Sequence, residues 1–313
     1  MLAASWLACH LPEGVLFRVA ELAGDFWYRV TPGRAAQARR NLRRVSRSLA
    51  ASGRGSASVR AAASDPAALE RLVRSSYRHA ARYYVEVARN PSLTPAYVDE
   101  RLAMDTPELI AEAVVPGKAV LFVGLHFGSL ELAVVFLAFQ VGETVTPMET
   151  IADPGLQAYF ERTRGVAGIR LVGLREARRE LLEALRTGIP VGLVGDRDLT
   201  GGGIPIPLFG APAMLPMGPA MLAVESGVPV YGMTVRRQGK ARFRGKLIPI
   251  EVPVEGTRRE RVTATMTHLA AAFEDLIADA PDQWWAVFFP IWPDLEAEAT
   301  AAAPRRGSEG APA

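Results

Sequence analysis

Ala119-Val-Leu-Phe-Val-Gly-Leu-His126-Phe-Gly-Ser-Leu-Glu131 is the stretch that decides the fold class of this 313-residue chain. Its first seven residues are apolar or small and follow Pro116-Gly117, which is typical of an interior strand over 119–125. A short turn comes next, and the apolar periodicity over 130–140 predicts a helix. His126 therefore stands at the C-terminal end of a strand, where open α/β sheets bind their ligands.

His126 and Glu131 make this strand end a candidate catalytic site. A histidine just before a helix and a carboxylate one turn inside it can converge, because the intervening turn brings the two side chains together. Imidazole accepts a proton near neutral pH, and a neighbouring carboxylate selects its tautomer. The spacing predicts a general base pair. It equally fits a capping histidine beside an exposed glutamate.

A second apolar stretch, Ile189–Gly195, also ends in polar residues, namely Asp196-Arg197-Asp198. Two strand ends with polar residues favour one shared crevice. Asp-x-Asp is found in metal-dependent enzymes, where both carboxylates hold a divalent ion. A salt bridge with Arg197 inside the fold explains the same residues without a ligand.

From residue 116 onward, predicted strands alternate with predicted helices. This alternation predicts an α/β fold with a mostly parallel central sheet flanked by helices. We expect an α/β core over 116–294, after a helical region over 1–115 and before a disordered tail over 295–313. The expected strands are 119–125, 169–173, 189–195, 228–235 and 242–250, and the expected helices are 130–140, 154–164, 176–187, 215–226 and 258–280.

The first 90 residues are strongly basic and helical in pattern. They hold fifteen arginines and six acidic residues, and the segment from Phe26 to Ser64 has no acidic residue at all. An amphipathic helix is predicted around Val15–Val30, then a basic helix, then a mobile connection over 48–66. Such a region can cap the core or lie on an anionic membrane surface.

The composition excludes several classes of protein. Cys9 is the single cysteine, so neither a disulfide framework nor a thiolate metal site is expected. The N-terminus lacks the basic start of a signal peptide. The apolar run over 119–139 contains His126, Glu131 and two glycines, so it is interpreted as strand plus helix and not as a membrane span. We expect any membrane attachment to be peripheral.

Several blocks, in order, resemble the lipid A lauroyl acyltransferase-like branch of the bacterial lysophospholipid acyltransferase superfamily. The first is His126-Phe-Gly-Ser-Leu-Glu131, similar to the family's His-x4-Asp/Glu block. The others are Ala81-Arg-Tyr-Tyr-Val-Glu86, Asp196-Arg-Asp-Leu-Thr200, Pro205-Ile-Pro-Leu-Phe-Gly210, Gly218-Pro-Ala with Ser226-Gly-Val-Pro229, and Pro281-Asp-Gln-Trp284. Within this branch, the Asp-Arg-Asp-Leu block and the tryptophans near the end most resemble phosphatidylinositol mannoside acyltransferases.

The resemblance implies a glycerolipid acyltransferase-like core and an acyl transfer. His126, held by Glu131, would deprotonate a glycolipid hydroxyl, which attacks an acyl thioester of acyl-CoA or acyl-carrier protein. Backbone amides at the start of the helix after Phe127-Gly128 would stabilise the oxyanion. We expect the acceptor to contact Glu149, Arg164, Asp196, Arg197, Asp198 and Thr200. No metal, other cofactor or nucleic acid is implied, and the expected location is the cytoplasmic face of an anionic membrane.

Two departures from the pattern concern the substrate. Glu131 stands where these enzymes usually have Asp, and no histidine follows Trp284-Trp285. A lipid A-type acceptor therefore stays open as an alternative. Two further classes also stay open: a metal-dependent glycosyltransferase using Asp196 and Asp198, and a non-catalytic membrane- or nucleic-acid-binding protein that uses the arginine-rich region.

Overall fold

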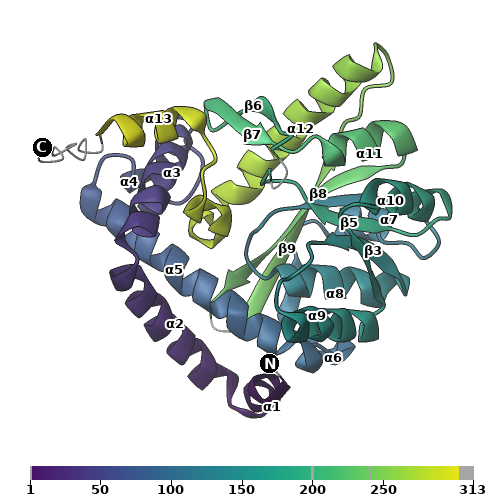
Figure 1. Cartoon of the computed structure of the whole chain (residues 1–313), viewed down its shortest axis with the longest axis horizontal. Coiled ribbons are helices and arrows are strands. Elements are labelled where there is room, and N and C mark those ends of the chain that lie inside the picture. Colours follow the sequence, from purple (N-terminus) through teal and green to yellow (C-terminus); the bar gives the residue numbers. More distant parts are fainter. Residues whose placement is uncertain (1, 199–200, 240, 303–313) are drawn as a thin grey trace, which may run out of the picture.

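The computed structural model describes residues 2–198, 201–239 and 241–302. In these residues a central sheet is covered by helices on both faces, and the helices of the first 100 residues wrap one side of the molecule (Figure 1). The N-terminal elements are α1 (Leu2–His10), α2 (Glu13–Val30), α3 (Pro32–Ala51), α4 (Ala57–Ala61), α5 (Pro66–Ala88), η1 (Asn90–Ser92), α6 (Pro95–Arg101) and α7 (Pro107–Ala113), with strand β1 (Leu102–Met104) before α7.

The remaining elements alternate between strand and helix, as expected from the sequence. The strands are β2 (Leu121–Gly124), β3 (Thr144–Met148), β4 (Ile169–Gly173), β5 (Val191–Val194), β6 (Ile204–Leu208), β7 (Ala211–Leu215), β8 (Val230–Gln238) and β9 (Arg242–Ile250). The helices are α8 (Leu130–Val141), α9 (Pro154–Val166), α10 (Ala177–Arg186), α11 (Gly218–Ser226), α12 (Arg258–Ala278), η2 (Pro281–Gln283), η3 (Trp285–Phe288) and α13 (Pro293–Ala302).

The described residues form one seven-stranded sheet in the order β1-β9-β8-β2-β5-β3-β4, plus the β6–β7 hairpin. Every pairing in the large sheet is parallel except β8 with β9. The predicted mostly parallel sheet flanked by helices is therefore confirmed. β2 is central, and its side chains alternate between two cores: Leu121 and Val123 pack on one face of the sheet, and Val120 and Phe122 pack on the other.

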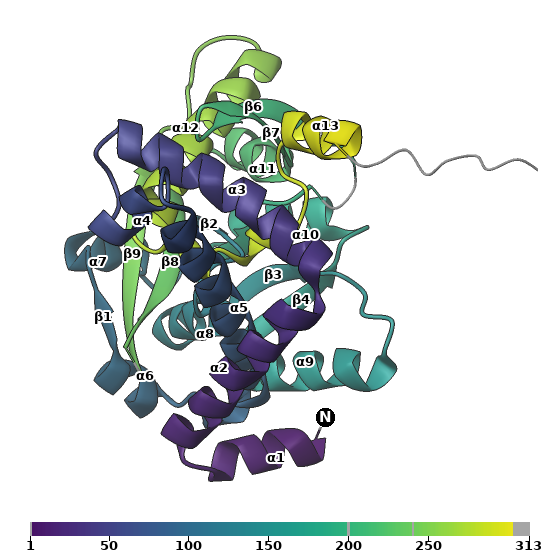
Figure 2. The same ribbon diagram turned by 90° about the vertical axis from the view of Figure 1, so that its left-hand side faces the viewer.

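The N-terminal helices form a second layer that rests on α5. Figure 2 shows α2 and α3 crossing the outside of this layer, one after the other. Small residues allow close packing there, because a Cβ on Gly24 would lie 2.7 Å from the Tyr77 carbonyl oxygen of α5. Asp25, also on α2, accepts hydrogen bonds from both Arg74 and Arg78 of α5 at 2.6–2.8 Å.

The structure differs from the sequence expectations in three places. Residues 295–302 were assigned to a disordered tail, but they belong to α13, whose Leu295 is buried. The segment expected to be a mobile connection over 48–66 contains the end of α3, all of α4 and the start of α5. β1 joins the sheet from within the region expected to be helical.

Within the described part of the chain, no helix combines the length and the apolar character needed to cross a bilayer.

Candidate active site

His126 and Asp196 meet because β2 and β5 are parallel neighbours. The register pairs Gly124 with Val194, so the residue two positions beyond each strand end lies at the same edge of the sheet. There His126 Nδ1 lies 2.7 Å from Asp196 Oδ1, and the His126 backbone N–H donates to Asp196 Oδ2 at 3.0 Å. The carboxylate thus holds both the ring and the backbone of the histidine.

Asp196 is buried and ionised. Burial alone would raise the pKa of Asp196, but the attraction of the His126 ring and hydrogen bonds from His126 and Trp284 outweigh it and lower that pKa. Trp284 Nε1 donates to Asp196 Oδ2 at 2.7 Å. An ionised carboxylate can only accept hydrogen bonds, so His126 carries a proton on Nδ1, and in the neutral ring Nε2 is the nitrogen with a free lone pair.

His126 lies at an apolar cavity of about 290 Å³ between α8 and the sheet. The β-strands contribute Phe122, Leu193 and Met233, among others, and α8 contributes Leu130, Ala133, Val134 and Leu137. The Trp285 ring stands edge-on to the His126 ring at 4.7 Å and lies 4.8 Å from the Tyr83 ring. A histidine that lines an apolar cavity can act on a substrate whose apolar part fills that cavity.

Glu131 does not occupy the position expected for it. Its hydrogen-bond partners among the described residues are Arg164, Asn90 and Tyr83, and His126 is not one of them. Arg164 approaches it in a fork, with Nη2 at 2.6 Å and Nε at 3.2 Å. The carboxylate that holds His126 is therefore Asp196, which the sequence analysis had placed among the acceptor contacts.

The Glu131 cluster is buried and charged. Burial opposes the charged form of Arg164, but the Glu131 carboxylate outweighs this and raises the pKa of Arg164. Burial, followed by the same carboxylate, raises the pKa of Tyr83, so its phenol stays protonated. Arg164 and Tyr83 both line the apolar cavity, whereas Glu131 lies behind them. Glu131 thus positions the polar side chains at the cavity wall.

Comparison with known proteins identifies the family of this chain. The family model described as bacterial lipid A biosynthesis acyltransferase matches residues 1–290. The chain belongs to this family. It is therefore an acyltransferase. It is 29% identical over 218 residues to the phosphatidylinositol mannoside acyltransferase of Mycolicibacterium smegmatis, covering 68% of this chain and 70% of that protein. It is 27% identical over 289 residues to the Mycobacterium tuberculosis protein of the same name, covering 90% and 84%.

The other residues that the sequence predicts for the site have different surroundings. Glu149 lines the same cavity as His126 and Arg164. Arg197 is not among the residues that line this cavity, and its guanidinium carbon lies 3.6 Å from the centre of the Phe289 ring. Asp198 accepts hydrogen bonds from the backbone amides of Gly201 and Gly203, at 3.0 and 2.7 Å. Thr200 lies outside the described residues.

These contacts argue against the metal-binding alternative for Asp196 and Asp198. The oxygens of Asp196 are engaged by His126 and Trp284, and those of Asp198 by the following glycine-rich loop. In the described residues, no group of three or more His, Cys, Asp or Glu side chains could hold a metal ion.

The amides of the turn after His126 bind backbone carbonyls of other segments. The Gly128 N–H donates to the Gln283 carbonyl at 3.0 Å, and the Ser129 N–H donates to the Val235 carbonyl at 2.8 Å. α8 begins at Leu130, and its first internal hydrogen bond runs from the Ala133 amide to the Ser129 carbonyl. The first-turn amides of α8 that precede Ala133, from Leu130 onward, therefore have no partner within the helix.

Sequence reasoning missed the contribution of Trp284, Trp285, Tyr83 and Asn90 to this acyltransferase site. Trp284 is buried and bonds to Asp196, and the Trp285 amide donates to the His126 carbonyl at 3.0 Å. The run Ala81–Glu86, quoted for its resemblance, was the available signal for Tyr83. No sequence signal points to Asn90, which donates to Glu131 at 2.7 Å.

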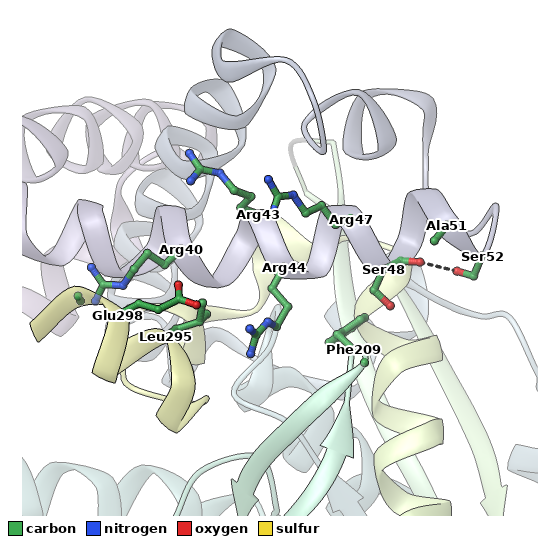
Figure 3. Close-up of a pocket in the computed structure, with 12 residues that line it drawn as sticks. Arg40, Arg43, Arg44, Arg47, Ser48, Ala51, Ser52, Phe209, Leu295 and Glu298 are labelled. Carbon is green, nitrogen blue, oxygen red and sulfur yellow. Dashed lines mark hydrogen bonds between the residues drawn. The ribbon is translucent and has the colours of Figure 1, made fainter. Parts of the chain in front are cut away.

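A larger hollow, of about 1030 Å³, runs along α3 beside α13 and the β6–β7 hairpin. Four arginines of α3 line it together with Phe209 and Leu295 (Figure 3): Arg40, Arg43, Arg44 and Arg47. Arg44 pairs with Asp294 and Arg40 lies 3.7 Å from Glu296. Figure 3 shows Arg43 and Arg47 side by side on the upper side of α3, and among the described residues neither has an ion-pair partner.

Proposed function

We propose that this acyltransferase moves a fatty acyl chain from an acyl thioester, acyl-CoA or acyl-carrier protein, to a hydroxyl of a phosphatidylinositol mannoside. The observation that carries the proposal is the His126–Asp196 pair, whose histidine lines an apolar cavity. The acceptor class is supported by the names of the two mycobacterial relatives. The acyl chain fills the cavity, and the thioester carbonyl then lies beside His126.

In the proposed reaction, His126 Nε2 removes the proton from the acceptor hydroxyl as its oxygen attacks the thioester carbon. Asp196 stabilises the imidazolium that forms, because it already accepts from Nδ1. The negative charge of the tetrahedral intermediate falls near the N-terminus of α8, whose first amides and helix dipole favour an anion. The C–S bond then breaks, and the proton on Nε2 passes to the departing thiolate.

The acceptor's sugar contacts the polar wall of the cavity. Glu149 and Arg164 line it together with His126, and Glu131 holds Arg164 in place. A carboxylate accepts hydrogen bonds from sugar hydroxyls, and a guanidinium donates to them. We propose Glu149 and Arg164 as acceptor-binding residues and His126 as the general base, with Asp196 as its positioning residue and Glu131 supporting Arg164.

The lipid nature of the acceptor requires contact with a membrane. The large apolar side chains of α1 and α2 supply a surface for it, because they are more than half exposed along one stripe: Trp6, Val15, Val19, Leu22, Phe26 and Val30. We propose peripheral attachment through this stripe, with the arginines of α3 contacting anionic headgroups on the cytoplasmic side.

The proposed function is tested by mass spectrometry of the products formed from palmitoyl-CoA and a panel of acceptors: a phosphatidylinositol mannoside, a lipid A precursor and lysophospholipids. His126→Ala and Asp196→Asn are each expected to lower kcat about 10²–10⁴-fold. His268→Ala is the matched control, since this half-buried histidine bonds to the Glu251 carbonyl and does not line the cavity. Transfer to the lipid A precursor alone would contradict the acceptor, and full activity of His126→Ala would contradict the mechanism.

A further inference from the structure

Two arginines lie over the same aromatic ring, that of Phe289. The Arg197 guanidinium carbon lies 3.6 Å from the centre of the Phe289 ring, and that of Arg34 lies 5.8 Å from the same centre. Arg34 also lies 5.6 Å from the Trp27 ring. Arg197 directly follows Asp196, and the segment that carries Phe289 starts with Trp284 and Trp285, which contact Asp196 and His126.

Neither of these arginines has an acidic partner within ion-pair distance among the described residues. Three other arginines of α3 each pair with an acidic residue: Arg39 with Glu70, Arg40 with Glu296 and Arg44 with Asp294. Arg197 is only partly exposed, and burial lowers the pKa of its guanidinium, a cost that the more distant Asp196 and Glu149 only partly offset. A partly desolvated guanidinium gains strongly from an anion.

Each of the two arginines is close in sequence to a part of the molecule that the proposed function uses. Arg197 directly follows Asp196, and Arg34 comes four residues after Val30, an exposed apolar residue of α2. The backbone of Phe289 is held in place, because Asn41 donates to the Phe289 carbonyl at 2.9 Å.

We infer that Arg34 and Arg197, which both lie over the Phe289 ring, bind a phosphate group of a substrate. The inference rests on the proposed function and assigns a ligand to this arginine pair. Guanidinium groups bind phosphate oxygens in pairs, and stacking on an aromatic ring leaves the N–H edges free to do so. Either substrate can supply the phosphate: the acceptor through its phosphodiester, or the donor through the phosphates of coenzyme A or of a phosphopantetheine arm.

Steady-state kinetics with paired substrates test this and separate the two sources. The acceptor arm compares phosphatidylinositol mannoside with a phosphate-free alkyl mannoside, and the donor arm compares palmitoyl-CoA with palmitoyl-N-acetylcysteamine. Arg34→Gln and Arg197→Gln are expected to raise KM about 10- to 100-fold in one arm, for the phosphate-bearing substrate only, with kcat little changed. Arg197→Lys, which keeps the charge and loses the fork, should recover part of the loss.

The matched control is Arg186→Gln, since the Arg186 side chain at the end of α10 is 71% exposed and 3.9 Å from Glu183. Equal KM changes for phosphate-bearing and phosphate-free substrates in both arms, or no change in either, would overturn the inference.

A binding measurement separates failure of this inference from failure of the proposed function. Calorimetric titration of the full-length protein with glycerophosphoinositol and with free coenzyme A needs no turnover. We expect one of the two to bind the wild type and Arg186→Gln equally, and about 10- to 100-fold more weakly to Arg34→Gln and Arg197→Gln. An inactive wild type that shows this pattern would refute the proposed transfer and keep the phosphate site. Binding that is unaffected by both substitutions would refute the site, whatever the activity.

Discussion

Two buried carboxylates serve different purposes in this site. Asp196 is bonded to His126, the residue proposed to do the chemistry, whereas Glu131 is bonded to Arg164 at the cavity wall. A carboxylate bound to a histidine determines which ring nitrogen carries the proton and stabilises the imidazolium. A carboxylate bound to an arginine supplies the countercharge of a buried cation, and its loss leaves that cation unpaired. The two roles predict different responses to substitution.

Glu131→Gln is expected to lower stability and activity together. Removing one partner of a buried ion pair costs about 3–5 kcal/mol, and the Arg164 side chain is only 13% exposed. Thermal unfolding should therefore show a marked fall in Tm, and Glu131→Asp, which keeps the charge, should restore part of it. An unchanged Tm with a large loss of kcat would show instead that Glu131 takes part in the reaction directly.

At the level of single elements, the turn between β2 and α8 places His126. Gly128 has φ of +53° there, and a Cβ at this position would lie 2.0 Å from the Val235 carbonyl oxygen. The backbone of β8 is thus pressed against the turn. The amides of Gly128 and Ser129 bind the Gln283 and Val235 carbonyls, which ties the turn to two other segments.

Gly128→Ala is expected to destabilise the protein by more than about 1–2 kcal/mol, since a left-handed backbone and a steric clash act together. Activity should fall as well, because the clash moves the turn that carries His126. The matched control is Gly165→Ala, on α9, where a Cβ meets nothing within 4 Å and the change should stabilise the helix by about 0.5–1 kcal/mol. Equal unfolding free energies for the two variants would contradict this account.

The contact between α2 and α5 is expected to depend on pH. Hydrogen bonds from Arg74 and then Arg78 hold the pKa of Asp25 well below its usual range. Because the folded pKa lies below the unfolded value of about 3.9, the stabilisation is fully present above that pH and is lost as the pH falls toward the folded pKa. Asp25→Asn should lower Tm at pH 7, and the difference from the wild type should shrink in scans below about pH 4. A difference that stays constant would contradict the prediction.

At the scale of the whole molecule, apolar and basic side chains are exposed on consecutive helices of the N-terminal layer. α2 turns Phe17, Ala20 and Gly24 toward the body of the protein and leaves other apolar side chains, among them Leu22 and Phe26, exposed. α3 continues from it with exposed Arg43 and Arg47 (Figures 2 and 3). An apolar stripe that meets a basic one suits the interface of an anionic bilayer, where apolar groups insert and guanidinium groups stay with the phosphates.

Replacement of Leu22 and Phe26 by Gln is expected to weaken binding to anionic vesicles about tenfold or more per residue, since each loses at least about 1.5 kcal/mol of burial in lipid. Flotation with vesicles containing phosphatidylinositol measures this. Val254→Gln is the control, because that side chain is 83% exposed and lies outside the stripe. Arg43→Gln and Arg47→Gln should weaken binding at low salt only. Unchanged flotation of the double α2 variant would contradict attachment through the stripe.

The local elements were predictable from the chain alone. The strand ending before His126, the helix after it and the predicted helices over 154–164, 176–187 and 258–280 agree with the structure to within a few residues. The periodicity of apolar residues and the glycines and prolines at element boundaries are local properties, so they can be recognised in a single sequence. β3 and the β6–β7 hairpin were missed. β3 contains Pro147, and β6 alternates isoleucine with proline. Proline within an apolar run argues against a strand, because it cannot donate a backbone hydrogen bond.

The partners of the charged residues came from the fold. His126 had Glu131 five positions away in sequence, but the parallel pairing of β2 with β5 brings Asp196 to its ring instead, and the packing of α9 brings Arg164 to Glu131. The same holds for α2, whose pattern defines an apolar face without saying whether protein or solvent covers it. Short-range order follows from the identity of neighbouring residues, whereas a contact across the sheet depends on strand order, which no local pattern encodes.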